Sequence, residues 1–453
     1  MTTDNFTLPI KAGLPQTVAD ADGFQNRNTL NSYIPIRTQG NDFDWASVVG
    51  LVLRGLLRKK VEKYSYQDFT TDCKANLQNK LGEEEFWNVL EDMYFTNEDI
   101  FSVTPEFLLF KSQKSQDKKF TRDMRMASLF INLLQGQQIE RFESNLNFLE
   151  EEFLQTLLDK TKPDRDKDFQ VTESPYLPYM AAAFKRDLKF LTGYPKYLLD
   201  EFERFLAFYG FAYTAQLSLS LSDWKTGEAP TAKPLYFIMD HERASGERIH
   251  IKKHGYKLFS ESSFKLFPFL SMLENLQPNP EILKKPLWQL AKDIKSSERS
   301  DLSGYIENYA KMFRRNRKLE TAIPEKAETA IDWLEYALKL AEEQFRDPKT
   351  DRPGTIKKYI KAVEENMATD FVQARGRSGR VLVLTQDHII LLTNLVVGKE
   401  EKLRFHELIL GFQGRGIFVD KQTEQELIKF YERIGNVERM SDSGDAVYVR
   451  KTI

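Results

Sequence analysis

The sequence predicts a mainly α-helical protein, with a multi-helix body, a small β-hairpin insertion and a C-terminal winged-helix-like domain. Apolar residues recur at three- and four-residue steps along most of the 453 residues, as on the buried stripe of a helix. Strand-like runs are short and rare. Hydrophobic residues make up 41% of the chain and charged residues 29%, a composition typical of packed domains with a charged surface.

Composition shifts and proline-containing polar segments divide the chain into five parts. The N-terminal arm lacks helical period, and we expect it to be either disordered or fixed to a partner, with one short strand at Tyr33–Arg37. The expected parts are the arm (1–41), an N-terminal helical domain (42–162), a central helical domain with the small β insertion (163–345), a linker with a connecting helix (346–380) and the winged-helix-like domain (381–453).

Two segments inside these domains are predicted from their periodicity. Gln137–Lys160 carries apolar residues at helical spacing, which predicts one long amphipathic helix. Tyr236–Asp240 and Arg248–Lys252 are short β-like runs on either side of the polar stretch His241–Glu247. Such a pair of runs predicts the hairpin.

The residues after position 380 follow the order of a winged helix. Helices are expected at Gln386–Val397 and Leu403–Phe412, a third begins at Thr423, and Val437–Met440 with Ala446–Val449 forms a two-stranded wing. Winged helices often place the third helix in the major groove of DNA. Carboxylates on this helix would repel phosphates, so docking to a protein is favoured over insertion into DNA. Its charged side chains are Glu424, Glu426, Lys429, Glu432 and Arg433.

Two runs near the C-terminus, Arg415–Asp420 (RGIFVD) and Arg439–Val449 (RMSDSGDAVYV), carry a family resemblance. They resemble the end of the DNA phosphorothioation-dependent restriction protein DptG family, over the part of the chain from about residue 380 onward. Elsewhere only the chain length and helical character are similar. The resemblance implies a bacterial defence role together with two partners, DptF-like and DptH-like ATPase or nuclease subunits. It carries over no catalytic residue.

Residue patterns that carry chemistry are few. No GxxxxGK run followed by Ser or Thr is present, which excludes a P-loop ATPase. His250 and His254 have a spacing that suits a metal site on a helix, but this segment is predicted as strand and turn. Asp164, Asp166 and Asp168 faintly resemble a nuclease motif, but we expect them in a solvated loop.

The single cysteine, Cys73, cannot form an intrachain disulfide or a multi-cysteine metal site. It has no obvious histidine partner, so we expect a structural thiol. The sequence therefore predicts no catalytic residue, no metal site and no cofactor.

Two clusters of basic residues are candidate DNA contacts. One lies near the end of a predicted helix, and the other lies in a Gly/Ser-containing loop before the winged-helix-like domain. The alternatives are that the first cluster stabilises the helix dipole and that the second is only solvated. The candidates are Arg314, Arg315, Arg317 and Lys318 in the first cluster and Arg375, Arg377 and Arg380 in the second.

The formal net charge of −2 argues against a free-standing nucleic-acid binder, which usually carries a basic excess. The sequence shows no secretion signal and no apolar run of membrane length, so we expect a cytoplasmic protein without membrane contact. We expect a non-catalytic adaptor or scaffold subunit of a phosphorothioation-dependent restriction complex. The alternatives are a divergent metal-dependent nuclease subunit and an autonomous winged-helix DNA-binding regulator.

Overall fold

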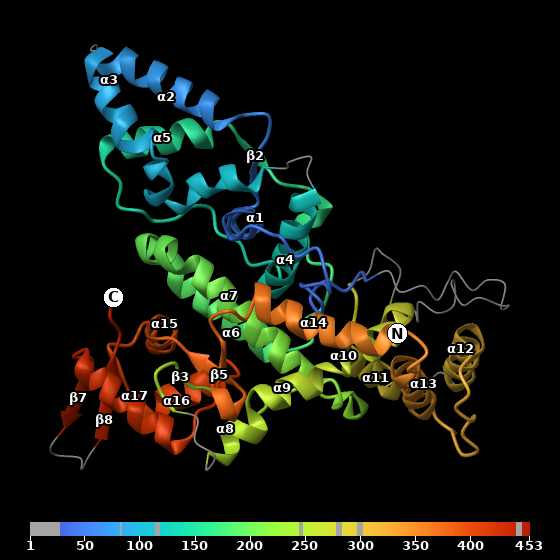
Figure 1. Cartoon of the computed structure of the whole chain (residues 1–453). Helices are drawn as coiled ribbons and strands as arrows, with labels where there is room; N and C mark the ends of the chain where they lie inside the picture. Colours follow the sequence, from blue (N-terminus) through green and yellow to red (C-terminus); the bar gives the residue numbers. More distant parts are fainter. Residues whose placement is uncertain are drawn as a thin grey trace.

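The computed structural model describes residues 28–81, 84–113, 118–243, 248–277, 283–296, 302–440 and 446–453. Within these ranges the chain is mainly helical and its strands form small sheets, which confirms the predicted fold class at this level. Figure 1 shows α6 (Pro178–Thr192) and α7 (Pro195–Ser220) in the middle of the molecule, between an N-terminal group of helices and a C-terminal unit.

The N-terminal group is organised around α1 (Trp45–Leu57), which is buried along most of its length. Gly50 lets η5 (Pro105–Ser112) lie against this helix, because a Cβ at Gly50 would stand 2.7 Å from the Leu108 carbonyl oxygen. The other elements are the antiparallel pair β1 (Lys59–Val61) and β2 (Thr161–Pro163), with α2 (Tyr66–Leu81), α3 (Glu84–Leu90), η3 (Glu91–Phe95), η4 (Asp99–Ser102), α4 (Lys118–Leu134) and α5 (Phe148–Leu158).

The long helix predicted over Gln137–Lys160 is wrong, because only α5 within this range is α-helical. The residues before α5 use their backbone hydrogen bonds elsewhere. The Phe142 amide, for example, donates to the buried Glu106 carboxylate over 2.8 Å. Asn147 then begins the helix with a capping box, in which its side chain accepts from the Glu150 amide.

The described part of the arm, residues 28–41, lies on the chain's own helical body. The backbone amides of Asn31 and Ser32 donate to the buried Glu173 carboxylate over 2.9 and 3.3 Å. The strand predicted at Tyr33–Arg37 is wrong, because these residues form turns whose apolar side chains are buried in the core. The remainder of the arm lies outside the described residues.

The central helices form the largest part of the body. The second half of α7 is almost wholly buried, so this helix is the core against which the others pack. Pairs α12–α13 and α10–α13 pack together beyond one end of it. The elements are η6 (Lys167–Phe169), η7 (Trp224–Thr226), α9 (Tyr256–Ser263), α10 (Leu266–Leu273), η8 (Glu274–Leu276), α11 (Leu287–Ser296), α12 (Leu302–Arg317), α13 (Ala330–Arg346) and α14 (Arg352–Asn366).

The C-terminal unit consists of helices around a three-stranded antiparallel sheet. The sheet has the order β6-β8-β7, and its first strand lies between two helices in the sequence. The elements are β4 (Val372–Ala374), η9 (Gly376–Ser378), β5 (Arg380–Leu384), α15 (Gln386–Val397), β6 (Lys402–Arg404), α16 (Phe405–Gln413), α17 (Lys421–Arg433), β7 (Val437–Met440) and β8 (Ala446–Arg450).

The hairpin predicted around residues 241–247 is wrong. Its first run contains β3 (Ile238–Met239), but its second run belongs to a helix, α8 (Ile249–His254). Strand β3 pairs in parallel with β5, and the Phe237 amide donates to the Phe418 carbonyl over 2.8 Å. Partners far away in the sequence therefore take the hydrogen bonds that a local hairpin would have used.

A buried ion pair joins the C-terminal unit to the central helices. The Arg415 Nε, just after α16, donates to the Asp187 carboxylate of α6 over 2.7 Å. The Tyr209 hydroxyl of α7 donates to the same carboxylate over 2.5 Å. Burial opposes the charge on Arg415, yet Asp187 and Tyr209 hold the pKa of the guanidinium above its ordinary value. The pair therefore links α6 and α7 to the end of α16.

A second buried network holds the beginning of α17. The Arg248 guanidinium donates to Glu242 over 2.8 Å and, through its Nε, to Asp420 over 2.9 Å. Asp420 is also the N-cap of α17 and accepts from the Thr423 amide over 3.0 Å. The N-terminal end of the third helix is thus fixed to the segment that joins β3 and α8.

We predict that Asp187→Asn lowers the free energy of unfolding by about 3–5 kcal/mol, because the charge of Arg415 stays buried without a charged partner. Urea denaturation at pH 7 measures the change. The matched control is Glu426→Gln, in the exposed pair with Lys429, which we expect to cost less than about 1 kcal/mol. Equal costs for the two variants would show that the buried pair does not hold the unit in place.

The His388 imidazole is buried at the start of α15, where it packs edge-on against the Phe371 ring at a centroid distance of 4.5 Å. The Thr385 hydroxyl accepts from the His388 amide over 3.3 Å and lies 2.7 Å from Nδ1, which suits a neutral ring. Burial, with a smaller contribution from Arg204, lowers the pKa of His388 to about 3. The folded chain therefore resists protonation of this ring, and stability is lost as the pH falls below about 6.5, the unfolded pKa.

We predict that wild type loses about 2 kcal/mol more stability than His388→Asn between pH 7 and pH 5, at about 1.4 kcal/mol per pH unit below the unfolded pKa. Urea titrations at the two pH values measure the difference. His406→Asn, on the exposed face of α16, is the control and should stay within about 0.5 kcal/mol of wild type at both. Parallel pH profiles for wild type and His388→Asn would contradict the prediction.

Candidate functional site

The second basic cluster is partly used inside the fold. The Arg375 guanidinium donates to the Asp240 carbonyl, and its backbone amide donates to Gly379 over 2.7 Å. Arg380 pairs with Glu364 at 3.3 Å, although its side chain stays exposed. Arg377 lies in η9, and its side chain is outside the described part of the structure. Contacts inside the fold therefore already engage Arg375, and a carboxylate already pairs with Arg380.

The first basic cluster lies at the end of α12, in a different part of the molecule (Figure 1). The Arg314 Nε donates to the Thr321 carbonyl over 2.9 Å, and the Arg317 guanidinium lies 5.9 Å from the centre of the Phe313 ring. Arg315 and Lys318 are exposed. The seven candidate residues thus do not form one surface.

The carboxylates that resembled a nuclease motif belong to a structural ion-pair cluster. Asp164 is buried and accepts from the Arg54 Nε over 2.8 Å, while Asp166 pairs with the same guanidinium at 2.6 Å. Asp168 is exposed. The expectation of a solvated loop is therefore wrong for Asp164. Because Arg54 occupies both carboxylates, they are not arranged to hold Mg²⁺.

Cys73 is buried in α2, where burial raises the pKa of its thiol well above the usual range. A thiol in this state is a poor nucleophile. Among the described residues, no group of three or more His, Cys, Asp or Glu side chains is placed to share a metal ion. No helix in the described ranges is long and apolar enough to span a membrane.

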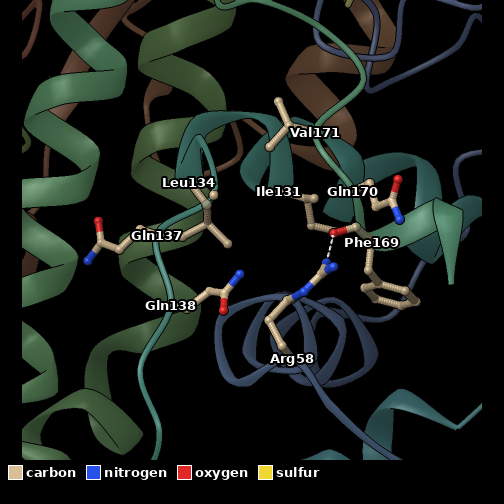
Figure 2. Close-up of a pocket in the computed structure, with 10 residues that line it drawn as sticks. Arg58, Ile131, Leu134, Gln137, Gln138, Phe169, Gln170 and Val171 are labelled. Carbon is tan, nitrogen blue, oxygen red and sulfur yellow. Dashed lines mark hydrogen bonds between the residues drawn. The ribbon is translucent and has the colours of Figure 1, made fainter. Parts of the chain in front are cut away.

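One small pocket, of about 180 Å³, lies between the end of α1, the end of α4 and residues 169–171. Figure 2 shows the Arg58 guanidinium reaching the Phe169 carbonyl oxygen, a hydrogen bond of 2.5 Å, with Gln138 nearby. The arginine thus connects two segments of the body. Nothing in this pocket indicates a ligand.

A larger pocket, of about 440 Å³, is lined by Tyr236 and by both histidines of α8. The Tyr236 and His250 rings stack at a centroid distance of 4.9 Å, and the His250 and His254 rings are 6.0 Å apart. The sequence prediction missed this site because it placed the histidines in a strand and a turn. Their four-residue spacing was the available signal, but Tyr236 joins them only in the folded chain.

The α3 and η3 segment carries an exposed apolar stripe, which we define as Phe86, Val89 and Met93. Val89 is 54% and Met93 56% exposed, and Phe86 is also exposed. Trp87 and Leu90 of the same segment are buried in the core. The apolar face of the segment is therefore wider than the part that the core buries. The sequence signal was this wide apolar face on a short helix, which periodicity alone reads as core.

We predict that Asp164→Asn lowers the free energy of unfolding by about 2–3 kcal/mol, because it removes a charged partner from the buried Arg54 guanidinium. Adding Mg²⁺ or EDTA should leave the melting temperature of wild type unchanged. The control is Asp168→Asn, at the exposed carboxylate, which should stay within about 0.5 kcal/mol of wild type. A melting temperature that rises with Mg²⁺ would support the nuclease alternative.

No protein-family model matches this chain, and no curated protein matches its sequence significantly.

Proposed function

We propose that this chain is a non-catalytic adaptor subunit of a bacterial DNA-targeting defence complex of the phosphorothioation-dependent restriction type. The observation that carries the adaptor role is the exposed apolar stripe on α3 and η3. The defence context comes from the resemblance of the C-terminal runs to the DptG family. The partners are the ATPase or nuclease subunits that this resemblance implies.

The stripe has the form of a helix-docking surface. Phe86, Val89 and Met93 follow a spacing of three and four residues, and such a contiguous apolar surface marks an interaction site. The segment also contains a π-turn, in which the Thr96 amide donates to the Glu91 carbonyl over 2.9 Å. Such turns are frequent at functional sites.

Acidic side chains around the stripe indicate the kind of partner. Glu85, Asp92 and Asp99 are exposed on the same short stretch of chain. An amphipathic helix with basic residues beside its apolar face would match both the stripe and these carboxylates. We therefore propose that a partner subunit supplies such a helix.

We further propose that the C-terminal unit is winged-helix-like and acts as part of the scaffold. Its order of elements, α15-β6-α16-α17-β7-β8 with β6 paired to β8, supports this reading. An autonomous DNA-binding regulator is less well supported. The beginning of α17 is held by Arg248, whereas recognition helices contact bases with their N-terminal residues.

Two exposed lysines of α17 and Arg439 of β7 also have partners within the unit. Lys421 pairs with Glu424 at 2.7 Å, Lys429 pairs with Glu426 at 2.8 Å, and Arg439 of β7 pairs with Glu432 of α17. Phosphate contacts depend on cations that release counterions. A helix whose charges are balanced in this way favours a protein neighbour over a DNA groove.

We predict that the double substitution Val89→Asp and Met93→Asp abolishes co-elution with the partner, because it places charge in an apolar contact. The tagged chain is co-expressed with the products of its two neighbouring genes and examined by size-exclusion chromatography. Loss of a central apolar contact costs about 2 kcal/mol or more, or at least about 30-fold in affinity. Both positions are exposed, so the melting temperature should change little.

Ile323→Asp is the matched control, since Ile323 is a similarly exposed apolar residue in the loop between α12 and α13. It should leave co-elution unchanged. Wild-type chain that elutes alone and cuts DNA by itself would overturn the adaptor proposal. Partner binding that survives the stripe substitutions would overturn the docking surface.

A further inference from the structure

The pocket beside α8 is built as a rigid platform. The Tyr236 amide donates to the His254 carbonyl over 2.9 Å, which attaches residue 236 to the last turn of α8. The Gln216 side chain of α7 donates to the Lys233 carbonyl and accepts from the Lys233 amide, both over 2.9 Å. The segment that carries Tyr236 is therefore held from two sides.

Gly255 permits this close attachment of α8. A Cβ at this position would stand 2.5 Å from the Ile251 carbonyl oxygen and 3.2 Å from the Tyr236 carbonyl oxygen. Only glycine fits between the two backbones without a shift. The result is that the His250 ring stacks on the Tyr236 ring with an angle of 23° between their planes.

The pocket offers a flat aromatic surface together with an apolar wall. His250 and His254 are exposed and Tyr236 is half-buried, so their rings are accessible to a ligand. Leu258 lines the pocket together with His254 and Ser262. Its volume of about 440 Å³ lies within the usual range of small-ligand sites. A planar heterocycle with polar edges fits this combination.

Exposed lysines lie on the same short helix as the two histidines, outside the lining of the pocket. Lys252 and Lys253 follow His250 on α8, and among the described residues neither has an ion pair with a carboxylate. Lys233, which lines the pocket, pairs with Asp223, so its charge is already balanced. An aromatic surface next to unneutralised lysines is the arrangement that binds single-stranded nucleic acid, in which bases stack on rings and cations follow phosphates.

We propose that the pocket of Tyr236, His250 and His254 binds an unpaired base of single-stranded nucleic acid, with Lys252 and Lys253 contacting the adjoining phosphates. A duplex is excluded as the main ligand because its bases are stacked on each other and do not present a free face. The two histidines alone are not proposed as a metal site, since the described residues supply no third ligand. This inference rests on the proposed function, because a DNA-targeting complex supplies the strand.

Fluorescence anisotropy with the full chain alone tests the proposal, using a labelled 12-nucleotide single-stranded DNA. The comparison ligands are a single-stranded RNA of the same length, the 12-base-pair duplex and AMP. His250→Ala should weaken single-strand binding by about 5- to 150-fold, as expected for loss of one stacking partner. Lys252→Ala with Lys253→Ala should also lower the slope of log affinity against log salt by about 1.4, or about 0.7 for each phosphate contact.

The matched controls stand outside the pocket. Lys357→Ala with Lys358→Ala removes a neighbouring lysine pair from the exposed face of α14, and His406→Ala removes an exposed imidazole from α16. Both should leave single-strand affinity and its salt dependence unchanged. A charge effect spread over the whole surface would instead lower binding equally in the two lysine variants, and this would overturn the proposal.

Three further results would overturn it. These are equal affinity for duplex and single strand, unchanged binding by His250→Ala, and AMP that binds as tightly as the strand, which would make the pocket a mononucleotide site. Selective single-strand binding that depends on His250 and on the lysine pair would support it. Since the partner is absent, failure here leaves co-elution through the apolar stripe intact, and the two proposals are separately tested.

Discussion

The arrangement of the molecule depends above all on the buried ion pair between Asp187 and Arg415. Buried charges are stable only when they are paired, so any movement of the C-terminal unit away from α6 would leave two charges in an apolar environment. Gly416 adds to this constraint, because a Cβ there would stand 2.6 Å from the Gln216 side chain of α7. The helical body and the C-terminal unit therefore behave as one piece.

A second network holds the third helix of the unit, α17, at its beginning. A recognition helix needs a free N-terminal end, whereas Asp420 and Thr423 are engaged by Arg248 at the beginning of α17. Arg248 in turn belongs to the segment that joins β3 to α8, so the contacts that hold the beginning of α17 also hold the beginning of α8, whose histidines are exposed. One network thus fixes both helices.

The sequence was sufficient where structure is local. Periodicity located α15 and α17, because a helix satisfies its hydrogen bonds within itself and needs only one buried face. It failed at Gln137–Lys160 and in the pairing of the run that contains β3, because backbone amides there donate to Glu106 and Phe418, far away in the chain. Counts of basic residues likewise do not show which side chains have partners inside the fold.

Arg314 and Arg375, for example, donate to carbonyl groups inside the fold. No sequence pattern distinguishes an arginine committed to a carbonyl from one that faces solvent. The sequence also does not show that the apolar stripe is exposed, because Val89 and Met93 follow the same spacing as buried residues. Figure 1 shows α3 near the top of the view and α8 near the bottom, far from each other in the molecule. Two weak contacts on one molecule strengthen each other only when the partners' sites match the distance between them.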